Sequence, residues 1–264
     1  MKRLLFAGLC VTFLLSPAVF AQVSASNPNT ASWTVGEKLV FEIKWGVVVA
    51  GEAVLEVPDL SEIEAGLANK KKVWAYHFLA TAKSNSFVDF FYKVRDRNDS
   101  WLDRDEWVTH RFEQHNQEGK YILEQTVDYD WVAKRFKNVE KVKGREPKLE
   151  EGDLTIPAVD TLSSLYLCRA KNLEVGKEYT FDVHSGRNWP LVLKVIRKET
   201  IKVTAGKFEC LLVEPFLRER GLFIQKGKKM QVWLTADEKK MPVMMRAEIF
   251  IGHVSAELKQ IIAR

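Results

Sequence analysis

Apolar and polar residues alternate along most of this chain, and that alternation limits what the chain can fold into. The clearest case is KLVFEIKW over residues 38–45, where Leu39, Phe41 and Ile43 fall on one face of an extended segment. A period of two is typical of a half-buried β-strand, because successive side chains of a strand point to opposite faces. Similar runs, separated by Gly, Asn, Asp and Lys, recur after Thr34, so we expect a chain built mainly from strands.

The runs place the expected strands along the whole of this part of the chain. The first hairpin spans residues 38–57, with Gly46 and Gly51 on either side of its second apolar run. Further strands are expected at residues 73–82, 91–102, 108–116, 120–128, 134–142, 178–184, 190–203, 207–215, 222–224, 229–235, 243–251 and 253–258. Residues 58–72 and 144–158 are rich in charge, proline or glycine and are expected to be loops.

One short stretch, QVWLTADEKKMPV at residues 231–243, predicts a hairpin in detail. Val232 and Leu234 fall on one face of the incoming strand and Trp233 on the other, and residues 236–240 turn the chain. Pro242 then starts the outgoing strand, a position where the missing N–H group of proline is tolerated.

A single segment, DTLSSLYLCRAKNLEVG at residues 160–176, predicts a helix. Asp160 is suited to cap the first turn, apolar residues recur at a spacing of three and four from Leu162 onward, and Gly176 follows the expected end. The helix is short and apolar on one side only, so we expect it to pack on a sheet.

Repeated hairpins with one helix favour a mainly β fold. The leading expectation is a strongly curved antiparallel meander sheet, or a partly open barrel, with one short packed helix, because curling limits exposed strand edges. A β-sandwich is the alternative.

The first residues predict a secretory signal peptide. Lys2 and Arg3 precede an apolar stretch of roughly a dozen residues, which is short beside the ~20 that a membrane-spanning helix needs. We therefore expect a signal peptide at residues 1–21 with cleavage near Ala21, a flexible N-terminal segment at 22–33 and a single β-rich domain at 34–264. This predicts a periplasmic or secreted protein that is not an integral membrane protein.

The charge of the chain predicts no nucleic-acid partner. The formal net charge is +5, and removing the two basic residues of the leader lowers the excess of basic residues to three. Basic clusters at residues 70–72 and 226–229 are short and adjoin turn signals, whereas nucleic-acid-binding proteins concentrate their basic residues in one footprint.

Two cysteines, Cys168 and Cys210, remain after the leader. An oxidising compartment would allow them to form a disulfide, but a disulfide requires Cα atoms within about 7 Å, a distance that the sequence does not give. Both lie in apolar settings, LYLCRA and FECLLV, so two buried free thiols are the alternative.

Motifs for catalysis and for metal or cofactor binding are missing from the sequence. The five histidines form no HExxH motif and no cluster with cysteine, and there is no GxSxG motif, glycine-rich phosphate loop or dinucleotide fingerprint. Carboxylates such as Asp103 and Asp105 could serve as an acid–base pair, but a chain with 35 acidic residues contains such pairs by chance. We therefore expect no catalytic residue, no metal and no cofactor.

The stretch FVDFFYKVRDRNDSWLD at residues 87–103 is the most unusual, because neither face of the expected strand is cleanly apolar. One interpretation is an exposed strand with surface ion pairs. The other is that Arg95, Asp96 or Arg97 points into a concave sheet face, where a charge must be paired or must meet a ligand. The chain also has eight tryptophans, whose large rings could line an apolar hollow. The candidate ligand-binding residues are therefore Trp45, Tyr92, Arg95, Asp96, Arg97, Trp101 and Trp233.

Five motifs in a fixed order carry a family resemblance: GEKLVFEIKWGVVVAGEAVLEV, FFYKVRDRNDSWLD, VDTLSSLYLCRA, GKFECLLVEP and VWLTADEKKMPV. Together they span most of residues 34–258, and the chain resembles an uncharacterised bacterial exported family, the domain of unknown function 3108. The resemblance implies an exported, β-rich single domain and supplies no catalytic residues. The hairpin at 231–243 is also similar to one in the lipoprotein-carrier half-barrels of the bacterial envelope, which is an analogy of fold only.

These features predict a non-enzymatic periplasmic protein that binds an apolar or amphipathic molecule of the cell envelope, a lipid or glycolipid, in a concave sheet face. The alternative is an envelope assembly or scaffold factor that binds another protein through a sheet edge. The second alternative is a hydrolase of envelope glycans or peptides, which only the abundance of carboxylates supports.

Overall fold

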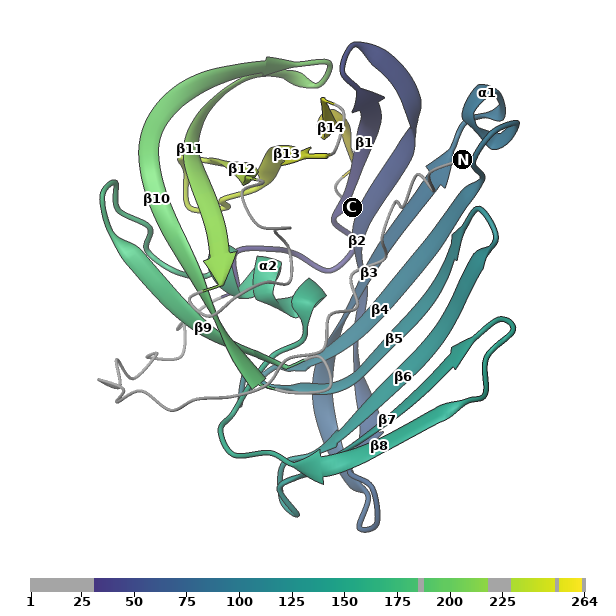
Figure 1. Cartoon of the computed structure of the whole chain (residues 1–264). Coiled ribbons are helices and arrows are strands. Elements are labelled where there is room, and N and C mark those ends of the chain that lie inside the picture. Colours follow the sequence, from purple (N-terminus) through teal and green to yellow (C-terminus); the bar gives the residue numbers. More distant parts are fainter. Residues whose placement is uncertain (1–30, 185–187, 218–228, 250–251, 263–264) are drawn as a thin grey trace.

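The strands of the chain pair largely with their neighbours in sequence, and one further pairing joins the first strand to the last. The computed structural model describes residues 31–184, 188–217, 229–249 and 252–262. Within them, 14 strands form one antiparallel sheet in the order β8-β7-β6-β5-β4-β3-β2-β1-β14-β13-β12-β11-β10-β9 (Figure 1). The elements are β1 (Lys38–Trp45), β2 (Val48–Ala65), β3 (Lys71–Ser84), α1 (Ser86–Asp89), β4 (Val94–Asp103), β5 (Thr109–Glu118), β6 (Tyr121–Asp130), β7 (Arg135–Val142), β8 (Lys148–Asp153), α2 (Thr161–Arg169), β9 (Glu178–His184), β10 (Asn188–Val203), β11 (Gly206–Leu217), β12 (Met230–Thr235), β13 (Pro242–Glu248) and β14 (His253–Ile262).

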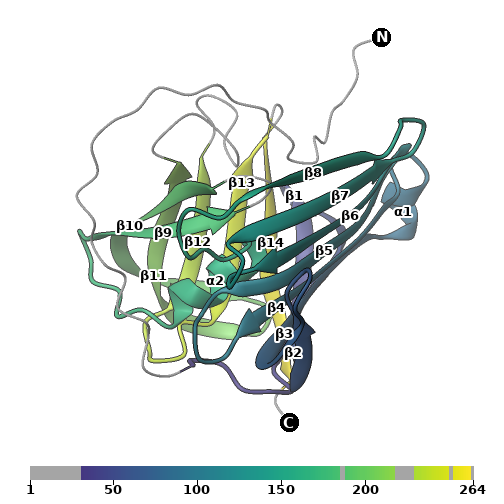
Figure 2. The ribbon, with the colours of Figure 1, turned by 90° about the horizontal axis from the view of Figure 1, so that it is seen from below.

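The sheet is strongly curved and open, as the alternation in the sequence predicts. β9–β14 and β1–β4 curve around α2, while β5–β8 extend to one side (Figure 2). The two ends of the strand order are β8 and β9, and part of the free edge of β9 is covered where Val159 forms a parallel bridge with Val183. No helix in the described part of the chain is long and apolar enough to cross a membrane. The expected signal peptide with its cleavage near Ala21, most of the segment 22–33 and the strand at 222–224 lie outside the described residues.

Two segments that we expected to be loops are strands. Residues 58–65 continue β2, which pairs with β3 as far as Ala65 and Lys71. The register of β2 against β3 shifts between Glu56 and Asp59, so Pro58 lies at an irregularity of the pairing. Its missing N–H group therefore breaks no regular pair, and the strand continues past it. Residues 148–153 form β8, whose charged composition is typical of a strand at a sheet edge.

The strand expected at residues 91–102 begins later, because a short helix precedes it. The side chain of Asn85 accepts a hydrogen bond from the backbone N–H of Val88 and caps α1. The chain turns through residues 90–93 before β4 starts at Val94, so Phe91 belongs to the turn. This second helix was not expected from the sequence, since four residues are too few to show a helical period.

α2 lies inside the curve of the sheet and fills it. Tyr166 stacks on Phe78 of β3 with ring centroids 3.7 Å apart, and the edge of Trp33 meets Tyr166 at 5.4 Å. Leu162 and Leu165 of α2 pack against a cluster of buried side chains from β1, β2, β14 and the β12–β13 turn. The buried members of this cluster are Leu39, Phe41, Leu55, Met241 and Leu258. The inner face of the curve is therefore packed core around α2.

The first turn of α2 is held by a buried carboxylate, that of Asp160. Its Oδ1 accepts hydrogen bonds from the backbone N–H groups of Leu162 (2.7 Å) and Ser163 (3.1 Å), as expected for a helix cap. Its Oδ2 accepts hydrogen bonds from the hydroxyls of Ser100 in β4 and Thr109 in β5. The cap therefore also fastens the helix to the sheet.

The other end of α2 is held by a buried ion pair. The guanidinium of Arg169 donates to both carboxylate oxygens of Glu37, at 2.6 and 2.9 Å, and the two side chains are 1% and 10% exposed. Arg169 also donates to the carbonyl of Lys239, at 3.2 Å, in the turn of the hairpin QVWLTADEKKMPV. α2 is thus tied at its last residue to the start of β1 and to the β12–β13 hairpin.

The possible disulfide between Cys168 and Cys210 is not formed; both are buried free thiols. Cys168 belongs to the inner cluster around α2, whereas Cys210 packs with Leu212 and Trp233 in a separate cluster. In β11 the side chain of Cys210 alternates with the inward Leu211, so the two thiols lie on opposite sides of the sheet.

We expect Asp160→Ala to destabilise the protein by about 3 kcal/mol, because it removes a helix cap and leaves two buried hydroxyls without their acceptor. Urea unfolding followed by circular dichroism measures this loss. Asn85→Ala is the matched control: it removes the cap of α1, which is exposed, and should cost about 1 kcal/mol or less. Equal losses for the two variants would contradict the anchoring role of Asp160.

We expect Arg169→Met to cost about 3–5 kcal/mol, because it leaves the carboxylate of Glu37 buried without its partner. The double variant Arg169→Met/Glu37→Leu should lose less than Arg169→Met alone, since no unpaired charge remains. Unfolding free energies of the two single variants and the double variant measure this coupling. A double variant that loses the sum of the single losses would show that the ion pair is not the anchor.

Candidate functional site on the outer face of the sheet

The strands β2, β3 and β4 carry a row of polar side chains on the face turned away from α2. In β2, Ala53 and Leu55 pack inward against the α2 cluster, so Val54 points outward. Val54 lies opposite Thr81 of β3, and Thr81 lies opposite Arg97 of β4. The outer face of these three strands is therefore built from residues that pair across the sheet.

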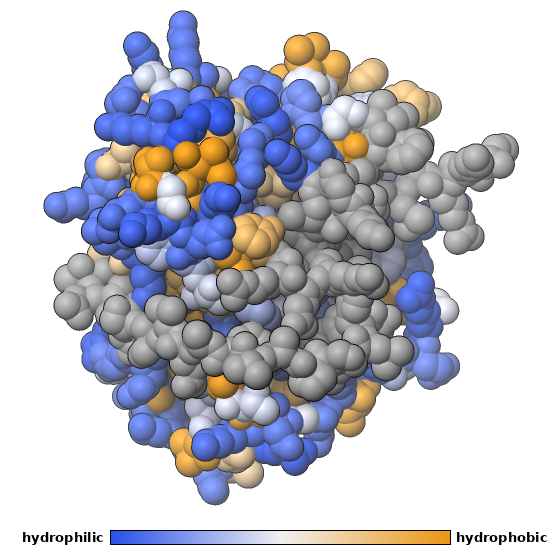
Figure 3. Space-filling view, turned by 60° about the vertical axis from the view of Figure 1, so that its left-hand side comes forward, coloured by the Kyte–Doolittle hydropathy of each residue, from blue (hydrophilic) through white to orange (hydrophobic). Residues whose placement is uncertain are grey.

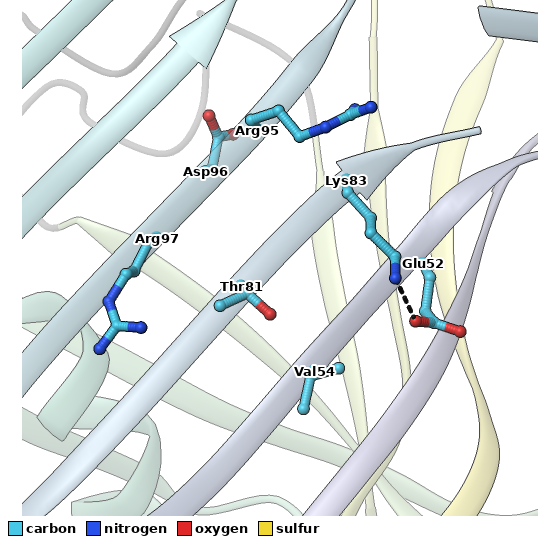
Figure 4. Close-up of a pocket in the computed structure, with 7 residues that line it drawn as sticks. All are labelled: Glu52, Val54, Thr81, Lys83, Arg95, Asp96 and Arg97. Atoms are coloured by element: carbon cyan, nitrogen blue, oxygen red, sulfur yellow. Dashed lines mark ion pairs between the residues drawn. The ribbon is translucent and has the colours of Figure 1, made fainter. Parts of the chain in front are cut away.

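A hollow of about 280 Å³ lies in this outer face and is called here the basic hollow. Figure 4 shows its residues, of which Lys83, Arg95 and Arg97 are cationic and Val54 and Thr81 form a less polar part. The lining residues are Glu52, Val54, Thr81, Lys83, Arg95, Asp96 and Arg97.

Each cation of the basic hollow is held by a carboxylate. Lys83 pairs with Glu52 at 3.1 Å, Arg95 binds Asp89 of α1, and Arg97 donates through Nε and Nη2 to Asp99, at 2.7 Å for both bonds. The cationic side chains remain 64%, 40% and 52% exposed, so these pairs contribute little to stability. They do orient the cations, and Nη1 of Arg97 has no bond to a described residue and is left for another acceptor.

The carboxylate of Asp99 is nearly buried, with 4% of its side chain exposed, and it also binds His77. Nε2 of His77 lies 2.8 Å from Asp99, its Nδ1 lies 3.3 Å from Asp59, and its ring stacks on Trp101 at 4.8 Å. Burial disfavours the charged ring, but the bonds to Asp99 and Asp59 outweigh burial and raise the pKa of His77. Burial tends to raise the pKa of Asp99, but the hydrogen bonds from His77 and Arg97 outweigh burial and lower the pKa of Asp99.

Asp96 borders the basic hollow but its carboxylate turns toward β5. It accepts a hydrogen bond from the backbone N–H of Gln117 at 3.0 Å, and Figure 4 shows it directed away from Lys83. Burial raises the pKa of Asp96 to about 6. Tyr92 lies close enough for Glu118 and Asp96 to add to the effect of burial, and its pKa is raised to about 12.

The structure therefore brings together four of the residues that the sequence singled out. Arg95 and Arg97 line the basic hollow, and Trp101 stacks beneath the same charged network. Asp96 also lines the hollow, although its carboxylate turns toward Gln117 of β5, and Tyr92 lies in the turn before β4.

The two remaining candidate residues lie elsewhere. Trp45 ends β1 and is half exposed. Trp233 of β12 is 4% exposed and donates from Nε1 to Glu199 at 2.8 Å, so it is part of a packed cluster.

Sequence reasoning missed Lys83 and His77, which complete the charged face. Both lie in β3, and both become neighbours of β4 through pairs such as Lys83 with Arg95 and His77 with Trp101. The signal that would have found them is the register of β3 against β4, which depends on where the chain turns.

The carboxylates that could have formed an acid–base pair have other partners. Asp103 accepts hydrogen bonds from Nε2 of His110 and from the backbone N–H groups of Asp105 and Glu106, while the carboxylate of Asp105 binds Arg104. Among the residues that the structure describes, no group of three or more His, Cys, Asp or Glu residues could hold a metal ion.

Comparison with known proteins gives a family and a likeness of fold. The sequence model of a family described as "Protein of unknown function (DUF3108)" matches residues 40–259. A β-barrel-like protein of the domain of unknown function DUF1849 from Brucella abortus has a similar structure, with a TM-score of 0.50 and 10% identity over 86% of this chain and 97% of that one. A Bacteroides fragilis protein with a YmcC-like fold follows, with a TM-score of 0.34 and 11% identity over 87% and 97% of the two chains. No curated protein matches the sequence.

We expect His77→Gln to lower the melting temperature more at about pH 5 than at about pH 8.5, because the raised pKa of His77 means that its protonated ring binds better in the folded state. That contribution is complete below the ordinary histidine pKa and is lost as the pH rises through the raised value. Asp99, with its lowered pKa, remains charged over this range. Thermal unfolding at both pH values checks this, with the exposed His115→Gln as control. An equal loss at the two pH values would count against the His77–Asp99 bond.

Proposed function

Since the chain belongs to the DUF3108 family, whose function is unknown, we propose a function from its own geometry: it is a non-enzymatic protein of the bacterial cell envelope that binds the anionic end of an amphipathic envelope molecule in the basic hollow. The observation that carries the proposal is the gathering of Lys83, Arg95 and Arg97 around one hollow. The ligand is of the class expected from the sequence, a lipid or a glycolipid.

The arrangement of the cations suits an anionic group such as a phosphate. Arginine presents several N–H donors in a fixed plane, which matches the geometry of phosphate and carboxylate oxygens. Asp99 and Asp89 hold the two guanidinium groups in place before a ligand arrives, so little side-chain freedom is lost on binding. Val54 and Thr81 give the hollow a less polar side for the adjoining part of the ligand.

The proposed site lies on the outer face because the inner face is occupied. Leu162, Leu165 and Tyr166 of α2 pack into the curve of the sheet, where the sequence led us to expect the ligand. A ligand on that side would have to displace the buried contacts of α2.

The proposed location is the periplasm or the outside of the cell. It rests on the leader at residues 1–21, whose charged start, apolar stretch and small residues near Ala21 are typical of an exported chain.

A second candidate function, an assembly factor that binds another envelope protein, has one observation in its favour. β8 lies at an end of the sheet and pairs on one side with β7, so in the described residues its other edge is open to a further strand. The charges of Glu150, Glu151 and Asp153 are of the kind that protects such an edge from pairing, so this candidate ranks second.

We expect the double variant Lys83→Gln/Arg97→Gln to lose its ligand, with affinity for a phosphate-bearing lipid falling at least about tenfold. The matched control is Arg111→Gln, which removes a similarly exposed arginine from the outer face of β5 and should keep the ligand. Native mass spectrometry of protein purified from periplasm without detergent, followed by extraction with organic solvent, reads out the bound molecule.

Two outcomes would contradict the proposal. One is a wild-type protein that carries no molecule and does not bind added phospholipid. The other is a lipid that stays bound in the double variant as well as in wild type, which would move the site away from the basic hollow.

A further inference from the structure

Two neighbouring turns expose an unusual amount of apolar surface at one end of the sheet. Residues of the β1–β2 turn and of the α1 region are exposed to 43–93% and are called here the apolar rim: Val47, Val48, Val49, Phe87, Phe90 and Phe91. Phenylalanine rings have a large apolar surface that is normally buried, so three exposed rings in one place indicate a surface that meets something apolar. In Figure 3, apolar side chains project at the upper end of the molecule, the end where Figure 1 has the β1–β2 turn and α1.

The apolar rim is one surface, because its two parts are bonded to each other. Nδ2 of Asn85 donates to the carbonyl of Val49 at 2.8 Å, and the backbone N–H of Asn85 donates to the carbonyl of Ala50 at 2.9 Å. Phe91 lies 5.7 Å from Phe87 and 5.0 Å from Phe90, measured between ring centroids.

The rings are held outward by the polar contacts of α1. Asp89 accepts hydrogen bonds from the hydroxyl of Ser84 and from the guanidinium of Arg95. These bonds fix the polar side of the short helix against β3 and β4, which leaves the phenylalanines on the side that faces solvent.

Cations flank the apolar rim at the same end of the strands. In an antiparallel meander the β1–β2, β3–β4, β5–β6 and β7–β8 connections all lie at the same end of the strands, and Figure 1 shows them there. Exposed basic residues at these connections are Lys93, Lys120, Lys143 and Arg145, and none of them forms an ion pair with another described residue. Glu146 is the exposed acidic residue of the β7–β8 turn.

We propose that the apolar rim docks the protein onto the surface of an anionic lipid bilayer, with the phenylalanines entering the interface and the flanking cations lying among the lipid headgroups. A projecting set of apolar side chains bordered by lysine and arginine is the arrangement of proteins that lie on anionic membranes. Trp45, half exposed at the end of β1 beside this surface, is a residue type that favours the interface. Membrane docking goes beyond the proposed ligand site, and it uses other residues.

The first test is sedimentation with vesicles of phosphatidylglycerol and phosphatidylethanolamine, compared with vesicles of phosphatidylcholine alone. Wild type should bind the anionic vesicles, and the binding should weaken as salt is added. Phe90→Ser/Phe91→Ser should lower the partition coefficient at least about tenfold. Lys93→Glu/Lys120→Glu should lower it by about tenfold on anionic vesicles.

Matched controls separate the apolar rim from the rest of the surface. Val132→Ser removes an apolar residue that is 84% exposed at the opposite end of the strands, and Lys239→Glu changes an exposed cation at that end. Both variants should bind the vesicles as wild type does. Arg97→Gln removes a cation of the basic hollow, so it separates the two sites, and it should reduce vesicle binding less than the phenylalanine variant does. Thermal unfolding of every variant verifies that the fold is intact.

A fluorescent label reports the position of the rim directly. The environment-sensitive dye NBD can be attached to Phe90→Cys, because Cys168 and Cys210 are buried and burial raises the pKa of each thiol to about 12. Its emission should shift to the blue when anionic vesicles are added, and the same dye on Val132→Cys should not respond.

Three results would overturn the proposal. They are a wild type that binds neither kind of vesicle, vesicle binding that the phenylalanine variant retains, and a loss of vesicle binding in Arg97→Gln as large as that in the phenylalanine variant. The last result would assign the vesicle contact to the basic hollow instead of the rim.

Discussion

The position of α2 inside the sheet depends on two buried charges. Asp160 at the start of the helix gathers two backbone N–H groups and two hydroxyls of β4 and β5, and Arg169 at its end gathers Glu37 and a carbonyl of the β12–β13 turn. A buried charge is stable when every bond it can form is satisfied, so each end of the helix has one position at which it fits. The apolar side chains between these ends then close the inner face, which leaves the outer face and the rim for contacts with other molecules.

Arg95 connects the basic hollow to the apolar rim. Its guanidinium lines the hollow while its bonds to Asp89 hold α1 and the phenylalanines in place. The charged stretch of β4 therefore has two structural roles. The ion pairs on its exposed face orient the cations, and one of them positions a neighbouring element.

The alternation of apolar and polar residues was enough to predict the class of fold and the hairpin at residues 231–243. The spacing of three and four from Leu162 onward, with Asp160 before it, was enough to predict the helix. Boundaries were wrong where a residue that usually ends a strand met a local irregularity, as at Pro58, and where an edge strand had the composition of a loop, as at 148–153. The direction of the side chains was not predictable, because the outer face also holds a buried cluster with Leu212 and Trp233. Arg95 and Arg97 could be singled out by their unusual pattern, but Lys83 and His77 join them only through the register of β3 against β4.

The pairing of β1 with β14 joins the two halves of the open sheet, and it brings together the first and the last described strands. Lys44 and Glu257, which are 213 residues apart in the sequence, form an ion pair of 2.7 Å across it. Every other pair among the described strands joins neighbours in the sequence, so each half of the sheet consists of local hairpins. The seam between them requires a long loop to close, and contacts of this kind make folding slow. Within the described sheet, the β1–β14 seam is therefore the strand pairing with the largest loop-closure entropy cost.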